Sequence, residues 1–552
     1  MAYVPCATFK GIIVVTSIGE PAQCINTIRS ISWLSRGTCT SDHAYIHHHF
    51  QKVLFRSHQQ SVFLSLRHLV VHFLVPLNID IMSRDQMSTE QLLPSAAVAN
   101  ERGFHIRNPT SGCLSFLHDS TTHIPFRDIL WSTGDGATRH ITYAARRGHK
   151  IQIESTDVIV PEGMDVMALA YPHSKPAPNI LVVVNNFGGQ GRAGERYRQH
   201  ILPVLRAARA TVTYMETQYA RHAVDIGREL DIARYDMVVC CLGDGVPHEI
   251  INGFWEREDR ATAFDKVAVT QLPCGSGNAL LLSTHGSNDA TKAALSMLKA
   301  RRSKIDVMSV TQGTRTRLSF LSQAYGVIAD LDIGTEHLRW MGPVRFELGV
   351  AQRLISKKKY PCELYVKYAA RGSEVARHFE RVRKSNGEEE SSEAEQYAVD
   401  SSRNGDSVPE PQAPPLSDPV PEDWEKVPAA NLSIFYVGKM PYMLSDAQFF
   451  PAALPRDGLM DLVITTTDSL FLKMARLLMA VDSGAHVHAP EVHHAKIAAY
   501  RLIPLVDPNK NYISVDGESF PVEPMQVEVL PSLLTVLLHE GEYVDTNFAE
   551  QK

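Results

Sequence analysis

Apolar runs that alternate with amphipathic stretches dominate the middle of the chain. From Ile180 onward, the strand-like runs ILVVVNN, TVTYMET, DMVVCCL and KVAVTQL are separated by helical patterns such as GERYRQHILPVLRAA and HEIINGFWERE. Apolar strands that alternate with helices are typical of a parallel sheet covered by helices on both faces. We therefore expect an α/β domain with a parallel sheet over residues 177–320.

Shorter runs of alternating apolar and polar residues flank this segment on both sides. GCLSFLH, IPFRDILW, RHITYAA and HKIQIES predict a small β-rich leading domain over residues 100–176. Strand-like runs return after Ile305 and predict a second β-rich domain over residues 321–541. Residues 385–425 interrupt that domain with an acidic, proline-rich stretch that is nearly free of aromatic residues. Such a composition predicts a disordered insertion.

The first 86 residues differ in texture from the rest of the chain. They are rich in His and Ser and show no sustained hydrophobic period, and two methionines, Met82 and Met87, follow closely. Residues 1–86 are either translated sequence upstream of the native start or a variable extension with a targeting role. The apolar stretch that starts at Ser61 is interrupted by Arg67 and His72, so we do not expect it to span a membrane.

Composition narrows the classes of function. The 552 residues carry a net charge of -6, which gives no bulk attraction to nucleic acid. The eight cysteines include no C-x-x-C pair, so we expect neither a zinc site nor a disulfide framework, and a reducing compartment fits best. Four histidines, His486, His488, His493 and His494, are interpreted as part of a connecting loop rather than as metal ligands. The Leu/Met-rich helix before them, around Leu470 to Met479, is expected to pack in the core.

Three glycine-containing loops follow successive strands of the predicted parallel sheet. The first runs from Asn185 to Arg192 (NNFGGQGR), the second is Gly243-Asp244-Gly245, and the third is Gly275-Ser276-Gly277-Asn278. Glycines let backbone amides approach an anion, and ligands bind at the carboxyl ends of strands in open α/β sheets. A carboxylate there, Asp244, could hold Mg²⁺, accept a proton from a hydroxyl nucleophile, or only cap a helix. Together the loops predict one polyphosphate site.

The same segments resemble a known family. NNFGGQGRA, GDGVPHEIINGF and LPCGSGNAL look like the diacylglycerol-kinase catalytic fold family. SFLSQAYGVIADLDIGTEHLRWMGPVRFELG, PAALPRDGLMDLV and ISVDGESFPVEPMQVEVLP narrow the resemblance to sphingosine kinases of the fungal long-chain-base type. The similarity covers roughly residues 178–541 without the insertion. It implies an α/β nucleotide-binding domain followed by a β-sandwich lipid-binding domain, with ATP in the cleft between them.

The resemblance also implies roles for individual residues. Asp244 would act as base, or hydrogen-bond acceptor, for the attacking hydroxyl, and Asp332 and Ser322 would bind the sphingoid headgroup. A buried carboxylate is costly unless a cation pairs with it, and for Asp332 this is the substrate ammonium, Arg339 or another basic side chain. The residues that would line the nucleotide site are Asn185, Phe187, Gly188, Gly189, Gly191, Arg192, Thr217, Gly243, Gly245, Glu249, Gly275, Ser276, Gly277, Asn278, Arg339, Arg345, Asp516, Gly517 and Glu518.

Four positions depart from the family pattern. Asn186 stands where proline is usual, Gln190 replaces a frequent lysine, Leu242 a serine and Cys274 an alanine. These changes bear on nucleotide affinity, and they keep a non-catalytic lipid-binding relative open as an alternative, beside a kinase of diacylglycerol or ceramide.

The expected reaction is transfer of phosphate from ATP, with Mg²⁺, to the primary hydroxyl of a sphingoid base such as sphinganine, sphingosine or phytosphingosine. The expected location is cytoplasmic and peripheral on membranes, with transient membrane contact and no nucleic-acid partner. The sequence sets no oligomeric state.

Overall fold

The computed structural model describes twelve stretches of the chain. They are residues 98–107, 121–134, 136–148, 150–186, 191–275, 277–334, 358–388, 407–445, 447–467, 473, 476–477 and 479–550. The chain divides into two units, residues 1–91 and 92–552, and every described residue belongs to the second. The expectation for residues 1–86 therefore lies outside the described residues.

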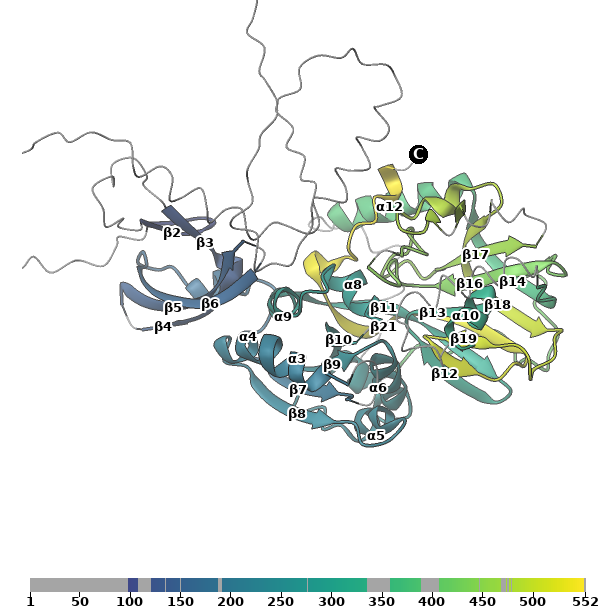
Figure 1. Ribbon diagram of the computed structural model, residues 1–552, viewed down its shortest axis with the longest axis horizontal. Helices are drawn as coiled ribbons and strands as arrows, with labels where there is room; N and C mark the ends of the chain where they lie inside the picture. The colour runs from purple at the N-terminus through teal and green to yellow at the C-terminus, as the bar shows by residue number, and fades with distance from the viewer. Residues whose placement is uncertain are drawn as a thin grey trace, which may run out of the picture. The chain divides into compact units, whose positions relative to one another are not determined.

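Two small antiparallel sheets precede the α/β region (Figure 1). Tyr171, just after helix α2, donates a hydrogen bond to the Leu130 carbonyl, and the Lys299 ammonium donates to the Ala170 carbonyl. The leading strands thus share one core with helix α9. The elements are β1 (Val98–Asn100), β2 (Gly103–Arg107), β3 (Thr121–Pro125), β4 (Ile129–Thr133), β5 (Thr138–Arg147), β6 (Lys150–Ile159) and α2 (Val166–Ala170).

A parallel sheet with the order β10-β9-β7-β8 forms the centre of the α/β region. Successive residues of β7 belong to different cores: Ile180 and Val182 pack with α4 and α9, whereas Leu181 packs with α5 and α6. This is why the strand is apolar throughout. The elements are β7 (Asn179–Val184), α3 (Ala193–Arg196), η4 (Tyr197–Ile201), α4 (Leu202–Ala207), β8 (Thr211–Glu216), α5 (His222–Glu229), β9 (Met237–Leu242), α6 (Gly245–Trp255), α7 (Arg260–Lys266), β10 (Ala268–Pro273), α8 (Ala279–His285) and α9 (Ala290–Lys299).

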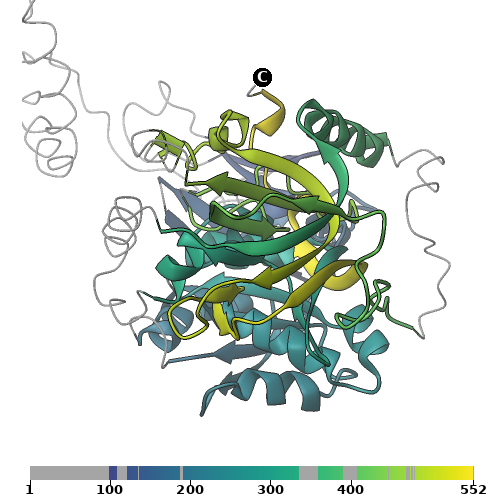
Figure 2. The ribbon, with the colours of Figure 1, turned by 90° about the vertical axis from the view of Figure 1, so that its right-hand side faces the viewer.

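The remaining described strands join in one large antiparallel sheet of eleven strands, shown from its face in Figure 2. Its main path is β12-β11-β21-β18-β17-β16-β13-β19-β20, and β14 pairs with β18 and β15. The elements are β11 (Arg301–Gln312), β12 (Arg315–Ser319), β13 (Ser322–Gly326), α10 (Val327–Asp332), β14 (Cys362–Arg371), α12 (Ser373–Glu388), β15 (Glu425–Val427), β16 (Leu432–Gly438), β17 (Met460–Thr466), η7 (Ala485–His488), β18 (His493–Pro504), β19 (Ile513–Val515), β20 (Glu518–Phe520), β21 (Met525–Leu538), η8 (His539–Gly541) and η9 (Phe548–Glu550). The predicted fold class is confirmed: a parallel α/β domain, then a β-sandwich-like domain.

The second half of the predicted disordered insertion differs from expectation. Residues 407–425 lie against strands β18 and β21, where the buried Arg501 guanidinium donates to the Asp418 carbonyl at 2.8 Å. The side chain of Glu528 accepts hydrogen bonds from the backbone of Gln412 and Ala413, and Trp424 is buried. Backbone carbonyls and one buried aromatic ring hold this segment, so its low apolar content did not decide its structure. Residues 389–406 lie outside the described residues.

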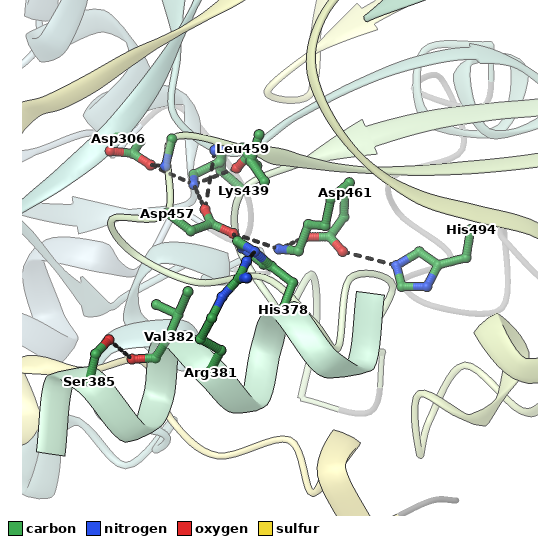
Figure 3. Close-up of polar contacts among 12 residues, drawn as sticks. Asp306, His378, Arg381, Val382, Ser385, Lys439, Asp457, Leu459, Asp461 and His494 are labelled. Atoms are coloured by element: carbon green, nitrogen blue, oxygen red, sulfur yellow. Dashed lines mark hydrogen bonds and ion pairs between the residues drawn. The ribbon is translucent and has the colours of Figure 1, made fainter. Parts of the chain in front are cut away.

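A cluster of buried charges lies inside the β domain, beneath helix α12 (Figure 3). The Lys439 ammonium contacts Asp306 and Asp457, both at 2.8 Å, and the Lys496 ammonium contacts Asp457 at 3.0 Å and Asp461 at 2.8 Å. All five side chains are at most 1% exposed. His378 of α12 and His494 of β18 contact Asp457 and Asp461 from the rim of the cluster. These pairs tie β11, β16, β17, β18 and α12 together.

Two surface expectations can be compared with the structure. No helix in the described part of the chain combines the length and the apolar character that a membrane crossing requires. In the segment predicted to be a core helix, Leu477 is buried, but the side chain of Met479 is 77% exposed. At its described end, the segment therefore has one buried and one exposed apolar side chain, so the prediction of a core helix holds there only in part.

Candidate active site

The carboxyl ends of the four parallel strands meet at one edge of the sheet. Val184 of β7 is in register with Glu216 of β8 and Cys241 of β9, and Leu242 of β9 is in register with Pro273 of β10. The residues that follow the four strands are Asn185, Thr217, Gly243 and Cys274. This edge brings together the described parts of the three predicted loops.

Backbone packing explains the glycines of the second and third loops. A Cβ atom on Gly275 would lie 2.4 Å from the Gly243 nitrogen, and one on Gly243 would lie 3.0 Å from the Gly277 oxygen. Side chains at these positions would separate the loops. Gly191, at the end of the first loop, has a φ of 68°, a conformation that glycine adopts without strain.

The Asp244 carboxylate points toward helix α8 and makes no cap of its own helix α6. It accepts hydrogen bonds from the backbone nitrogens of Ala279 at 3.0 Å and Leu280 at 3.2 Å. Burial raises the pKa of Asp244 to about 6, although these two amides and the side chain of Gln271 act in the opposite direction. At neutral pH the carboxylate is therefore mostly ionised, with a basicity suited to accepting a proton.

A tight turn from the β domain reaches the start of α6. Asp516 and Gly517 connect β19 to β20 with positive φ values of 52° and 84°, as a two-residue hairpin turn requires. The Asp516 carboxylate accepts hydrogen bonds from the Ser319 hydroxyl, from three successive backbone nitrogens and from His248. Both oxygens of Asp516 therefore accept hydrogen bonds within the protein, which fixes the turn, and the predicted contact of Asp516 with nucleotide stays a prediction.

Two glutamates approach the same helix start. The Glu249 carboxylate accepts a hydrogen bond from the Ala223 nitrogen at the start of α5, at 3.0 Å. Burial raises the pKa of Glu249, and the nearby negative charge of Glu518 adds to this increase. A Cβ atom on Gly245 would lie 2.9 Å from a carboxylate oxygen of Glu518, which places the Glu518 carboxylate beside the first residue of α6.

The two acids of helix α10 have different surroundings. Asp330 is buried and contacts the Lys358 ammonium at 2.9 Å and the Tyr360 hydroxyl at 2.7 Å. Asp332 is half-buried and accepts a hydrogen bond from the Ser514 hydroxyl at 2.6 Å. A Cβ atom on Gly517 would lie 4.0 Å from the Asp332 carboxylate, which places that carboxylate beside the turn that also reaches α6.

Two buried polar atoms at the strand ends have no hydrogen-bond partner within the described structure. They are the Thr217 hydroxyl and the side-chain oxygen of Asn278, in residues that are 3% and 5% exposed. Unpaired buried polar atoms are costly, and they are expected where a ligand completes the hydrogen bonding. Both residues were predicted to contact nucleotide, and the unpaired atoms fit that interpretation.

Ser322, predicted to contact the substrate, begins β13, and its hydroxyl donates to the Tyr436 hydroxyl at 3.3 Å. The remaining residues predicted to bind nucleotide divide into two groups. Arg192 forms an exposed ion pair with Glu195 at 2.9 Å, so its guanidinium is engaged on the surface in this conformation. The others lie outside the described residues: Phe187, Gly188, Gly189, Ser276, Arg339 and Arg345.

Three residues that the sequence did not single out support the site. His248 holds the Asp516 turn, Gln271 of β10 accepts a hydrogen bond from the Leu281 nitrogen in α8, and Ser514 holds Asp332. A polar residue inside an apolar strand, such as Gln271 in KVAVTQL, was the one available sign of such a role.

Two family models match the chain over the two domains that form the site. A family described as "Diacylglycerol kinase catalytic domain" matches residues 179–310, and one described as "YegS C-terminal NAD kinase beta sandwich-like domain" matches residues 428–538. The chain is 41% identical over 433 residues to "Sphingoid long chain base kinase 5" of Saccharomyces cerevisiae, a match that covers 70% of this chain and 62% of that protein.

Two further relatives are matched over most of their length. "Sphingoid long chain base kinase 4" of Schizosaccharomyces pombe is 31% identical, with 75% of this chain and 88% of the relative covered. "Sphingosine kinase 1" of Homo sapiens is also 31% identical, with 65% of this chain and 90% of the relative covered. The resemblance seen in the sequence motifs is thereby confirmed, and the chain belongs to the sphingosine kinase family, together with the sphingoid long chain base kinases.

Proposed function

We propose that the protein transfers the γ-phosphoryl group of ATP to the primary hydroxyl of a sphingoid base. One observation carries the proposal. The Asp516-Gly517 turn lies against α6, directly after Asp244, and also beside the carboxylate of Asp332. A carboxylate suited to accept a proton and a carboxylate suited to hold a cation therefore flank one turn. An amino alcohol has the two groups that such a pair would recognise.

The chemistry assigned to the protein is mainly positioning and proton acceptance. Asp332, oriented by Ser514, would pair with the ammonium of the base and so place the neighbouring hydroxyl toward Asp244. Asp244, oriented by the amides of α8, would accept the hydroxyl proton as the oxygen attacks the γ-phosphorus. The bond from the γ-phosphorus to the bridging oxygen breaks, and ADP leaves.

The residues at the strand ends would hold ATP. Amides of the glycine loops would face the phosphates, and Thr217 and Asn278 would pair their buried polar atoms with the nucleotide. Among the described residues, no group of three or more His, Cys, Asp or Glu side chains could hold a metal ion. Mg²⁺ usually binds through one or two carboxylates together with substrate phosphates. Glu249 and Glu518 fit that mode, and the ion would neutralise phosphate charge.

The substrate class follows from the charge of Asp332. Ceramide and diacylglycerol lack a free amine, so neither could neutralise this carboxylate, whereas a sphingoid base would. Covering Asp332 with a lipid that lacks an amine would remove water from the carboxylate and supply no cation in return, which is unfavourable. We therefore assign the free sphingoid base as the substrate. A preference of the enzyme for ceramide or diacylglycerol would contradict this assignment.

The lipid must come from a bilayer, so we also propose transient, peripheral contact with a membrane from the cytoplasmic side. The test of the function is transfer of labelled γ-phosphate from ATP to sphinganine by the full chain, with a short-chain ceramide and diacylglycerol in parallel. Labelling of sphinganine is expected. Labelling of neither sphinganine nor the others would indicate a non-catalytic relative.

A further inference from the structure

We infer that Tyr436 recognises the second hydroxyl of the sphingoid base, the one on the chain side of the carbon that carries the amine. The inference rests on the proposed function, because it assumes that Asp244 and Asp332 take the primary hydroxyl and the ammonium. Sequence motifs did not indicate Tyr436. Its placement follows from the strand register.

Three neighbouring strands place Tyr436 and the Asp332 site on one face of the sheet. Ala324 of β13 lies opposite Tyr436 of β16 on one side and opposite Ser514 of β19 on the other. Residues directly opposite each other in antiparallel strands project to the same face. Ser514 holds the Asp332 carboxylate, so Tyr436 and that carboxylate flank the small side chain of Ala324. Two strand spacings, about 10 Å between the Cα atoms of Tyr436 and Ser514, separate them.

The hydroxyl of Tyr436 is oriented by its surroundings. The Ser322 hydroxyl, two residues before Ala324 on the same face, donates a hydrogen bond to the phenol oxygen at 3.3 Å. The ring is fixed by Phe449 and Phe450, whose centroids lie 5.1 Å and 4.8 Å from its own. Because the phenol oxygen accepts from Ser322, its own proton can be donated to another acceptor. The phenol is therefore held in place and has a proton available for a ligand.

Electrostatics keep this donor protonated. Burial raises the pKa of Tyr436 well above its usual value, and the negative charges of Asp332, Asp516 and Asp244 add to the increase. The phenol thus interacts electrostatically with Asp332, which is assigned to the ammonium, and with Asp244, which is assigned to the reacting hydroxyl. Tyr436 therefore offers a neutral O–H donor among carboxylate acceptors. A further carboxylate at this position could only accept hydrogen bonds.

The headgroup of a sphingoid base carries three adjacent polar groups: the primary hydroxyl, the ammonium and a secondary hydroxyl. Asp244 and Asp332 account for the first two. The secondary hydroxyl gives up its hydrogen bonds to water on entering the site, and a buried hydroxyl that finds no new partner costs roughly 1–3 kcal/mol. Tyr436 can donate to its oxygen. The alternative is that Tyr436 only fills the core, since its side chain is 8% exposed, and the experiment separates the two.

The experiment measures kcat/KM of the full chain for two substrates, sphinganine and an otherwise identical amino alcohol that lacks the secondary hydroxyl. The wild type should prefer sphinganine by about tenfold, the effect of one hydrogen bond. Tyr436→Phe should lose about tenfold with sphinganine, lose little with the deoxy substrate, and so lose the preference. The deoxy substrate keeps the amine and the primary hydroxyl, so it reports on the rest of the site.

The matched control is Tyr500→Phe. Tyr500 is buried too, at 0% exposed, and its hydroxyl donates to Gln323, the neighbour of Ser322 that projects to the opposite face. This variant should keep the wild-type preference. Should Tyr436→Phe fail to fold, Tyr436→Met is the second variant: it also lacks the hydroxyl, its flexible apolar side chain can fill the place of the ring, and it should lose the preference. An unchanged preference in Tyr436→Phe, or an equal loss with both substrates, would overturn the inference. Wild type that labels neither substrate would overturn the proposed function itself.

Discussion

The Nδ1 atom of His248 lies 2.8 Å from a carboxylate oxygen of Asp516, although 268 positions separate the two residues in the sequence. His248 belongs to the first turns of α6, and Asp516 belongs to the turn between β19 and β20. The contact therefore joins the α/β domain to the β domain directly behind Asp244. It makes the geometry of the candidate site depend on both domains.

Replacing Asp516 tests this dependence. Asp516→Ala leaves the Ser319 hydroxyl, three backbone nitrogens and His248 without their acceptor. Hydrogen bonds to a buried charged group contribute about 1.5–3 kcal/mol each. We expect a thermal unfolding midpoint several degrees lower and a raised KM for ATP. Asp507→Ala, in an exposed loop of the same domain, is the control and should change neither quantity. Equal midpoints in the wild type and Asp516→Ala would contradict the positioning role.

The acid limb of the pH profile should belong to Asp244. Its pKa is raised to about 6, and a base must be deprotonated to act. As pH falls through 6, kcat/KM should decrease, approaching a tenfold loss for each further pH unit. Steady-state rates between pH 5 and pH 8 measure this, with unfolding followed over the same range. A profile that stays flat down to pH 5 in folded protein would exclude Asp244 as the base.

Asp244→Asn should abolish transfer and leave the fold intact. We expect a loss of kcat of about 10²–10⁴-fold. The raised pKa also predicts the sign of a stability change. The folded state disfavours the ionised form of Asp244, so the wild type loses stability as pH rises from the ordinary carboxyl pKa through 6. The melting temperature of Asp244→Asn relative to the wild type should therefore be higher at pH 8 than at pH 5. A variant that retains a tenth of wild-type kcat would contradict the assignment.

The sequence predicted the strand-end loops because parallel strands present their carboxyl ends at one edge, so short motifs in chain order become neighbours. It could not predict the pairs His248–Asp516 or Ser514–Asp332, because nothing local to either residue specifies a partner so distant in the sequence. The segment 407–425 was misjudged for another reason. A prediction from composition depends on the number of apolar side chains. This segment is held instead by its backbone carbonyls, which accept hydrogen bonds from the Arg501 guanidinium.

The charge of Asp332 should decide which lipids are accepted. Removing one partner of a fully buried ion pair costs about 3–5 kcal/mol. Asp332 is half-buried, so a somewhat smaller cost is expected, and Asp332→Asn should raise KM for sphinganine by about 10²-fold. KM for ATP should change much less, because Asp332 is assigned to the lipid. The preference for sphinganine over a short-chain ceramide should narrow in the variant. The control is Asp482→Asn, an exposed aspartate, which should behave as wild type. Equal KM values for sphinganine in the wild type and Asp332→Asn would exclude the ammonium contact.

The buried cluster of Figure 3 should make the β domain sensitive to the loss of a single charge partner. Lys439→Met removes a cation that contacts Asp306 and Asp457, and it leaves Lys496 as the one lysine beside three buried carboxylates. Such a break costs about 3–5 kcal/mol.

The thermal unfolding midpoint of Lys439→Met at pH 7 should therefore fall well below that of the wild type. Lys175→Met removes an ion pair with Asp236 in which the lysine side chain is 59% exposed, and it should have little effect because exposed pairs contribute little. The double variant Lys439→Met with Asp306→Asn should recover part of the loss, because one unpaired carboxylate disappears with its cation.

The pH dependence of this stability difference has a definite sign. The neighbouring ammonium groups hold the pKa of Asp457 well below its usual value, so the contribution of the cluster is present above the ordinary carboxyl pKa and is lost on acidification. The difference between wild type and Lys439→Met should shrink as the pH falls. Equal losses in the single and double variants would show that packing of the long lysine side chain, and not its charge, stabilises the domain.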